Sequence, residues 1–181
     1  MSPALSWSRL SLLPLLALLG ACASSPSAAS AGDGATFIVV RHAEKAGDDP
    51  RDPHLSAAGQ ARAQALAQRL RNTPVTAAYA TEFRRTRETA SPTAQTHGIP
   101  VVAYDARSAA SATAAHWKTQ HPRGTVLVVG HSNTVPDLVA ALCQCSVQAM
   151  DDSEYDRLSI VRIDAAGAAT LDVQRYGAPS P

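Results

Sequence analysis

The sequence predicts an α/β fold, a three-layer α/β/α sandwich with a mostly parallel central sheet. Short apolar, β-branched runs such as TFIVV (36–40) and TVLVVG (125–130) are typical of strands buried on both faces. Stretches with helical spacing of apolar residues separate these runs. Strands that alternate with helices indicate a parallel sheet with helices on both of its faces.

The expected elements follow one another over residues 36–177. After the strand at 36–40 we expect a helix from Ser56 to about Arg71, a strand at 75–81, a helix at 83–96 ending at His97-Gly98, a strand at 100–104, a helix at 108–121, a strand at 125–130 and a helix from Pro136 to about Leu142. The last two segments, RLSIVRI and AATLDVQRY, alternate polar and apolar residues on either side of Ala165-Ala166-Gly167, which predicts an antiparallel hairpin.

Length and composition limit the class of protein. A chain of 181 residues is expected to hold one domain and an appendage. Hydrophobic residues make up 45% and charged residues 17%, so the composition is not that of a disordered chain. A formal net charge of +1 argues against a nucleic-acid-binding protein, which would carry a basic face.

The first residues are expected to be an export signal. Residues 1–21 combine Arg9 with a short apolar stretch that contains Pro14 and is too short to span a bilayer, which predicts a signal peptide. LGAC at 19–22 resembles a bacterial lipobox, so we expect lipidation of Cys22, with ordinary cleavage nearby as the alternative. Residues 22–35 read as a flexible tether. The protein is then periplasmic and lipid-anchored, and Ala23 favours the outer membrane.

Polar residues stand where two of the expected central strands end. Arg41 and His42 follow the first strand, and His131 follows the strand at 125–130. Ligands of open α/β sheets bind beyond the carboxyl ends of the strands. A neutral imidazole is a good nucleophile near pH 7, and arginine forks match phosphoryl oxygens. One histidine as nucleophile, a second as donor and two arginines as clamps would form a phosphoryl-transfer site without a metal.

Three motifs carry a family resemblance. VVRHAEK, ATEFRRTRETA and VVGHSNTVP resemble the motifs of the histidine phosphatase superfamily, the phosphoglycerate mutase-like phosphohydrolases. The segment HLSAAGQARAQAL is similar to the first helix of that family. The resemblance covers roughly residues 36–176 and implies a phosphoglycerate mutase-like sandwich. It also implies that His42 is the phosphorylated nucleophile and that Arg41 and His131 hold the phosphate.

The middle motif supplies the second clamp in this comparison. The resemblance maps Thr81 and the residues after it onto the run before Arg85, which we choose as the second arginine. Arg84 and Arg87 are expected to face solvent or the rim, because successive helical positions do not share a face.

The general acid is where the sequence departs from the family. Relatives place an aspartate directly after the second histidine, where this chain has Ser132, or a glutamate between the second and third motifs. The carboxylate found in that segment here is Asp105, with Glu82 as the competing choice. Asp105 could instead cap the following helix, and Glu82 could pair with a neighbouring arginine.

These observations predict a metal-independent phosphohydrolase that acts on a small phosphate ester or phosphoramidate and needs no cofactor. The segment between the second and third motifs is too short to form a lid over the site, which disfavours a phosphoglycerate mutase-like phosphotransferase. The remaining alternatives are a lipoprotein that binds a phosphorylated ligand without turnover, and a zinc site, for which the sequence has no closely spaced ligand pattern. The sequence does not determine the oligomeric state.

Some residues keep two readings. Tyr155 or Arg157 could line the pocket, although packing at the edge of the sheet is the favoured reading. A helix would turn the side chains of Cys143 and Cys145 apart, whereas a loop would allow a disulfide in an oxidising compartment. The other histidines are expected on the surface, with the loop 46–55 around His54 able to fold over the pocket: His54, His97, His116 and His121.

Overall fold

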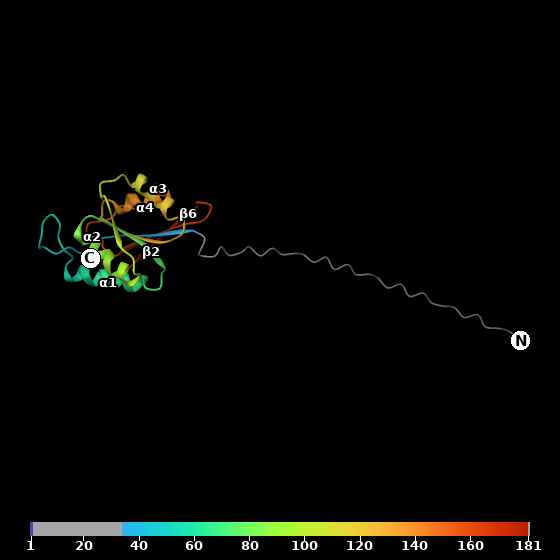
Figure 1. Ribbon diagram of the computed structural model, residues 1–181, viewed down its shortest axis with the longest axis horizontal. Coiled ribbons are helices and arrows are strands. Elements are labelled where there is room, and N and C mark those ends of the chain that lie inside the picture. Colours follow the sequence, from blue (N-terminus) through green and yellow to red (C-terminus); the bar gives the residue numbers. More distant parts are fainter. Residues whose placement is uncertain (2–33, 181) are drawn as a thin grey trace.

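The structure is a computed structural model that describes Met1 and residues 34–180. A six-stranded sheet with the strand order β3-β2-β4-β1-β5-β6 forms its centre. The strands are β1 (Ala35–Arg41), β2 (Val75–Thr81), β3 (Val101–Tyr104), β4 (Gly124–Gly130), β5 (Arg157–Ile163) and β6 (Ala169–Arg175), and the helices are α1 (Ala57–Leu70), α2 (Arg84–Thr96), α3 (Ala110–Gln120) and α4 (Val135–Cys143). Helices α1 and α2 cover one face of the sheet, and α3 and α4 cover the other (Figure 1). The predicted three-layer α/β/α sandwich is confirmed.

Pairing of the strands brings the two histidine motifs together. β1 lies between β4, to which it is parallel, and β5, to which it is antiparallel. Arg41 pairs with Gly130 at the shared end of β1 and β4. His42 and His131 therefore lie at adjacent positions just beyond the carboxyl ends of these two strands, as the sequence predicted.

The core consists of two apolar clusters, one on each face of the sheet. Alternate residues of β1 point to opposite faces, so Phe37 contributes to the cluster under α3 and α4 while Ile38 contributes to the cluster under α1 and α2. Trp117, which is 2% exposed, packs against Tyr79 and Tyr104 in the first cluster. Both faces of the central strands are covered, which explains why their sequences are continuous apolar runs.

The loop between β1 and α1 is tied to the start of the helix. Ser56 caps α1, and its side chain accepts a hydrogen bond from Gly59 N across 3.1 Å. A Cβ at Gly59 would lie 2.2 Å from the carbonyl oxygen of Glu44, so only glycine allows this approach. The Glu44 carboxylate accepts from the buried Arg62 guanidinium at 2.7 Å. These contacts fix the chain just after His42.

The ends of the folded part differ slightly from the expected limits. β1 begins at Ala35, inside the stretch predicted as a tether. The fold also extends beyond 177, because Ser180 Oγ accepts hydrogen bonds from the main-chain nitrogens of Tyr155 and Asp156. The predicted signal peptide, Cys22 and most of the tether lie outside the described residues. Among the helices that the structure describes, none has the length and apolar character needed to span a bilayer.

Cys143 and Cys145 form a disulfide, with their Cα atoms 5.2 Å apart. α4 ends at Cys143, and Gln144 adopts a left-handed conformation with φ 54° and ψ 39°. Cys145 therefore lies outside the helix. Of the two alternatives that the sequence left open, the structure shows the one in which a residue outside the helix allows the bond.

Candidate active site

His42 lies directly after β1, and it is 4% exposed. Its main-chain nitrogen donates to Gly130 O across 2.9 Å, which continues the ladder between β1 and β4. Its Nδ1 lies 2.8 Å from the carbonyl oxygen of Ala43. Because a carbonyl only accepts, Nδ1 carries the proton and Nε2 keeps its lone pair.

Electrostatics keep this imidazole neutral. Burial lowers the pKa of His42 from 6.5 to about 3, and the charges of Arg41 and Arg85 act in the same direction, against the opposing effect of the bond to Ala43. A neutral histidine with an available Nε2 is a competent nucleophile at neutral pH.

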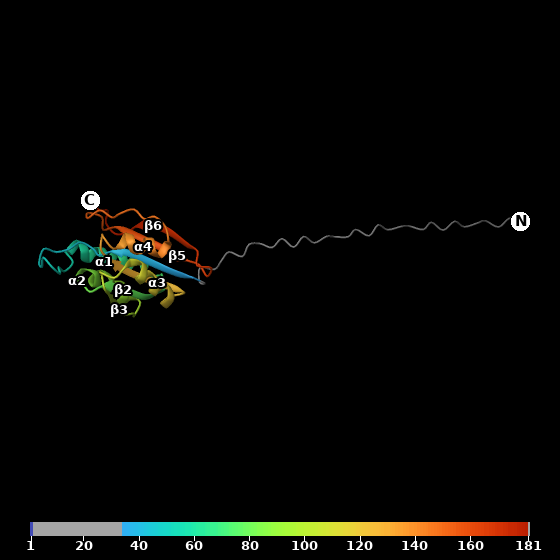
Figure 2. The same cartoon turned by 90° about the horizontal axis from the view of Figure 1, so that it is seen from above.

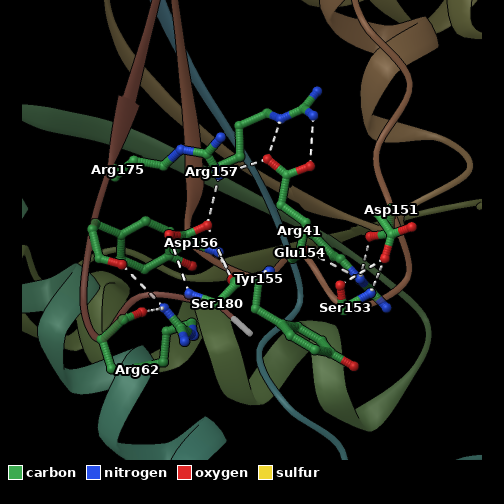
Figure 3. A network of polar contacts seen from close by, with 12 residues as sticks. Arg41, Arg62, Asp151, Ser153, Glu154, Tyr155, Asp156, Arg157, Arg175 and Ser180 are labelled. Atoms are coloured by element: carbon green, nitrogen blue, oxygen red, sulfur yellow. Dashed lines mark hydrogen bonds and ion pairs between the residues drawn. The ribbon is translucent and has the colours of Figure 1, made fainter.

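Arg41 ends β1, and the main chain of the loop before β5 holds its guanidinium. Its Nη1 lies 3.2 Å, 2.8 Å and 3.0 Å from the carbonyl oxygens of Asp151, Asp152 and Glu154 (Figure 3). The guanidinium carbon lies 4.1 Å from the ring centroid of Tyr155. The buried Nε has no hydrogen-bond partner among the described residues. This nitrogen is therefore a buried donor that the described residues leave unsatisfied.

A directed chain of hydrogen bonds orients His131. Arg85 Nη2 lies 3.5 Å from His131 Nδ1, and an arginine can only donate, so Nδ1 accepts. His131 Nε2 then carries the proton and donates to Thr81 Oγ1 across 3.0 Å. Thr81 Oγ1 donates to Thr86 Oγ1 across 2.8 Å, and Thr86 donates to Phe83 O across 2.7 Å. Each donor in this series of hydrogen bonds donates one proton to the next group.

His131 is also buried and neutral. Burial lowers its pKa to about 4, the charge of Arg85 lowers it further, and the carboxylate of Glu82 opposes them. The ring centroids of His42 and His131 lie 5.3 Å apart, with the planes at 66°.

Arg85 lies in the first turn of α2, and its side chain is 14% exposed. Its guanidinium carbon lies 4.4 Å from the ring centroid of Phe83, and its Nη1 lies 3.9 Å from Asp52. Its Nε is buried without a partner among the described residues, as is that of Arg41. Both arginines that the sequence indicated therefore present a buried donor.

The two carboxylates expected as general acids differ in their surroundings. The side chain of Asp105 is 49% exposed and pairs with Arg107 at 3.2 Å. Glu82 Oε2 lies 3.4 Å from the main-chain nitrogen of Ala106, and its charge raises the pKa of His131. Between the two, Glu82 is thus the carboxylate that acts electrostatically on a site histidine.

Sequence reasoning missed three residues that support the site. Thr89 Oγ1 accepts from Ala43 N across 3.0 Å, and its position one helical turn after Arg85 was a signal that could have found it. Asp152 accepts from Ser132 Oγ across 2.8 Å and lies 3.9 Å from Arg41 Nη2. Asp52 contacts Arg85 from the loop 46–55. Neither aspartate stands in a motif or a periodic segment.

The loop 46–55 packs against the beginning of α2. Asp52 accepts from the main-chain nitrogen of Arg84 across 2.8 Å, and His54 hydrogen-bonds Glu88. Arg84 and Arg87 are exposed, as expected. Tyr155 lies at the site, its ring centroid 6.2 Å from that of His42. Arg157 is instead buried against Glu154, which agrees with the structural reading.

The remaining histidines lie away from this group. His116 is exposed, whereas His97 and His121 are half-buried and lie within hydrogen-bonding distance of the Leu70 carbonyl and the Tyr79 hydroxyl. Their assignment to the surface was therefore only partly right. Within residues 34–180, no three His, Cys, Asp or Glu side chains gather as metal ligands would.

Two neutral histidines and the buried Nε donors of two arginines lie at the carboxyl end of a mostly parallel sheet, the arrangement expected of a phosphoglycerate mutase-like phosphatase. The family model described as histidine phosphatase superfamily (branch 1) matches residues 37–108, which include Arg41, His42 and Arg85. Over this range the chain is similar to the histidine phosphatase superfamily.

Solved structures share this fold. The protein histidine phosphatase SixA complexed with tungstate is 20% identical over 78% of this chain and 96% of its own, with a TM-score of 0.64. YhfR of Bacillus stearothermophilus is 18% identical over 77% and 96%, with a TM-score of 0.64. A mycobacterial glucosyl-3-phosphoglycerate phosphatase is 15% identical over 78% and 99%, with a TM-score of 0.61. At these identities the likeness establishes the fold. No protein of curated function matches the sequence.

Proposed function

We propose that this phosphatase works without a metal, through a phosphohistidine on His42. The observation that carries the proposal is the state of His42: a buried, neutral imidazole whose Nδ1 proton is committed to Ala43 O. Nε2 is left as the nucleophilic atom, and the buried Nε donors of Arg41 and Arg85 are suited to a phosphoryl group beside it.

The first step forms a bond between His42 Nε2 and phosphorus as the bond to the leaving group breaks. Arg41 and Arg85 stabilise the charge on the equatorial oxygens, and His131 donates from Nδ1 when it is protonated. The departing atom takes a proton. In the second step water attacks phosphorus, the phosphorus–nitrogen bond breaks, and His42 returns to its neutral form with release of inorganic phosphate.

Glu82 is our choice for the group that carries these protons. Both carboxylates are exposed, but the charge of Glu82 acts on His131, whereas the side chain of Asp105 is paired with Arg107. This reverses the order of preference that the sequence favoured. A carboxylate that remains near solvent assists weak leaving groups only moderately, so phosphoramidates and phosphate esters with good leaving groups are the favoured substrates.

The comparisons support a substrate range of this kind. One neighbour is described as a protein histidine phosphatase bound to tungstate, a tetrahedral oxyanion, and another as a phosphatase of a phosphorylated small molecule. Both descriptions are consistent with a small phosphate ester or a phosphoramidate as the substrate of this chain.

We also propose that the enzyme is anchored through a lipid on Cys22 and works in the periplasm. β1 begins at Ala35 and reaches the site at Arg41. The first residue of the strand therefore lies about 20 Å from the catalytic site, at the opposite end of the strand. An anchored molecule would then present its site away from the bilayer. Fractionation tests the anchor: the protein should sediment with membranes, and Cys22→Ala should release it.

Trapping the intermediate tests the reaction. Purified protein mixed with a phosphate-labelled substrate and quenched in base should carry label that is stable to alkali and released by acid, the behaviour of phosphohistidine. His42→Ala should carry none. Label on the His42→Ala protein would refute the assignment of the nucleophile. A wild-type protein that binds phosphate but never becomes labelled would instead be a binding lipoprotein.

A further inference from the structure

Each of the two clamp arginines lies over an aromatic ring. Arg41 stacks on Tyr155 at 4.1 Å, and Arg85 stacks on Phe83 at 4.4 Å. Each ring also neighbours one of the histidines: Tyr155 lies 6.2 Å from His42, and Phe83 lies 5.3 Å from His131 between ring centroids. Aromatic residues make up only 4% of the chain, so the site is rich in them compared with the rest of the protein.

Tyr155 is held firmly by its neighbours in the chain. Glu154 pairs with Arg157 and Arg175, both at 2.6 Å, and Asp156 pairs with Arg175 at 2.7 Å (Figure 3). Ser180 Oγ accepts from the main-chain nitrogen of Tyr155 across 2.7 Å. The residues on both sides of Tyr155 are thus fixed while its own ring is half-buried and its hydroxyl has no partner among the described residues. The side chain of Tyr155 therefore makes no hydrogen bond that would explain why a tyrosine stands there.

Phe83 is held in place by its main chain at the start of α2. It occupies the N-cap position of α2, and its carbonyl accepts from Thr86 Oγ1 across 2.7 Å. Its ring meets the ring of His131 edge to face, with the planes at 90°. The side chain is half-buried rather than part of either core cluster, so a portion of it remains accessible beside the site.

We propose that Tyr155 and Phe83 are specificity-determining residues that select phosphorylated compounds whose leaving group is a flat aromatic ring. A phosphoryl group held between Arg41 and Arg85 must project its leaving group past the rings stacked on them. Aromatic groups gain from edge-to-face and offset contacts with such rings, whereas the hydroxyls of a sugar would lose water without a matching partner. The inference rests on the proposed phosphate site between the two arginines.

Ligand binding tests the selection without relying on turnover. The probes are phenylphosphonate and methylphosphonate, which carry the same anion and differ in the ring, titrated into the purified full-length protein by calorimetry. We expect phenylphosphonate to bind about tenfold more tightly, as one good aromatic contact provides. Equal affinities would overturn the proposal. Binding of neither probe would overturn it as well, because the phosphate site itself would then be missing.

Variants of Tyr155 and Phe83 show whether their rings select the ligand or only position the arginines. Tyr155→Phe should keep the preference for phenylphosphonate, because the ring remains. Tyr155→Leu and Phe83→Leu should each reduce it by about three- to tenfold while changing the affinity for methylphosphonate little. Equal losses for both probes would mean that the rings only position the arginines, which contradicts the proposal. Retention of the preference in both leucine variants contradicts it too, and thermal unfolding confirms that each variant is folded.

These measurements are independent of the catalytic proposal. If the wild type shows the phenyl preference but no phosphohistidine forms, the catalytic function fails while the selection stands. If phosphohistidine forms and the preference for phenylphosphonate is absent, the selection proposal fails while the catalytic function stands. The two proposals can therefore fail separately.

Discussion

Arg85 Nη2 lies 3.5 Å from His131 Nδ1, so an arginine from α2 reaches the histidine that follows β4. The contact joins two motifs that stand far apart in the sequence, and it places the guanidinium beside the position that the phosphoryl group would take. It also sets the tautomer of His131, because the arginine cannot accept.

Loss of Arg85 should therefore slow the reaction strongly. We expect Arg85→Ala to reduce kcat/KM for an aryl phosphate by about 10²–10³-fold, the effect of one lost oxyanion donor. Arg87→Ala is the matched control, because Arg87 lies on the same helix with an exposed side chain, and its activity should stay close to wild type. Similar losses in both variants would mean that the charge of the helix, rather than the Arg85 position, supports catalysis.

Stability should fall as the pH drops from about 6.5 to 4.5. Burial lowers the pKa of His42 to about 3 and that of His131 to about 4, so the unfolded chain binds more protons than the folded one in this window. The histidines stabilise the fold fully above pH 6.5, and their contribution is lost as the pH falls toward the folded pKa values. The loss should amount to a few kcal/mol, on the order of 1.4 kcal/mol per pKa unit. Chemical unfolding at several pH values measures it.

The pH dependence has an internal control in the paired carboxylates. Neighbouring arginines lower the pKa of Glu154 and Asp156, so their contribution is lost only as the pH falls below about 4.5. His42→Ala should therefore flatten the stability curve between pH 6.5 and 4.5, where the carboxylates do not yet contribute. An unchanged slope in the variant would show that His42 is not held neutral by burial.

Substitutions of the two carboxylates should have different effects on hydrolysis. Glu82→Gln should slow hydrolysis of an alkyl phosphate by about 10²-fold, the contribution of a general acid, and should affect an aryl phosphate much less. Asp105→Asn should leave both rates unchanged, because its carboxylate is turned toward Arg107. If Asp105→Asn alone alters the pH profile for the alkyl substrate, Asp105 is the acid and our preference for Glu82 is wrong.

The disulfide should contribute little to stability and nothing to catalysis. It closes a very short loop, for which chain entropy predicts about 1–2 kcal/mol. It also lies at the far end of α4 from His131, about 14 Å along the helix. Reduction should lower the free energy of unfolding by that amount and leave kcat unchanged. Cys143→Ser/Cys145→Ser should not respond to reductant. Mass spectrometry after alkylation would show whether the bond forms.

Periodicity in the sequence predicted the sheet and the position of the main site residues. β1 and β4 are continuous apolar runs, and their pairing places His42 beside His131 without any information on side chains. Arg85 followed from its motif. The resemblance to a known family was needed to choose it over Arg84 and Arg87.

The parts that sequence could not predict depend on irregular loops. Arg41 is held by carbonyls from residues 151–154, a loop with no period that could show which main-chain atoms face the site. The position of Tyr155 follows from ion pairs between the loop before β5 and strand β6, such as Glu154 with Arg175. The choice between Glu82 and Asp105 turned on local pairing: Asp105 lies within a turn that brings Arg107 to its carboxylate.

The most direct test of the account is hydrolysis of an aryl phosphate by the purified protein in excess EDTA, measured beside His42→Ala. Aryl leaving groups need little help from an acid, so the measurement isolates the nucleophile. We expect full activity in EDTA and a loss of several orders of magnitude in the variant, with thermal unfolding to confirm that it folds. Activity that EDTA abolishes, or that His42→Ala retains, would contradict the assignment of His42 as a metal-independent nucleophile.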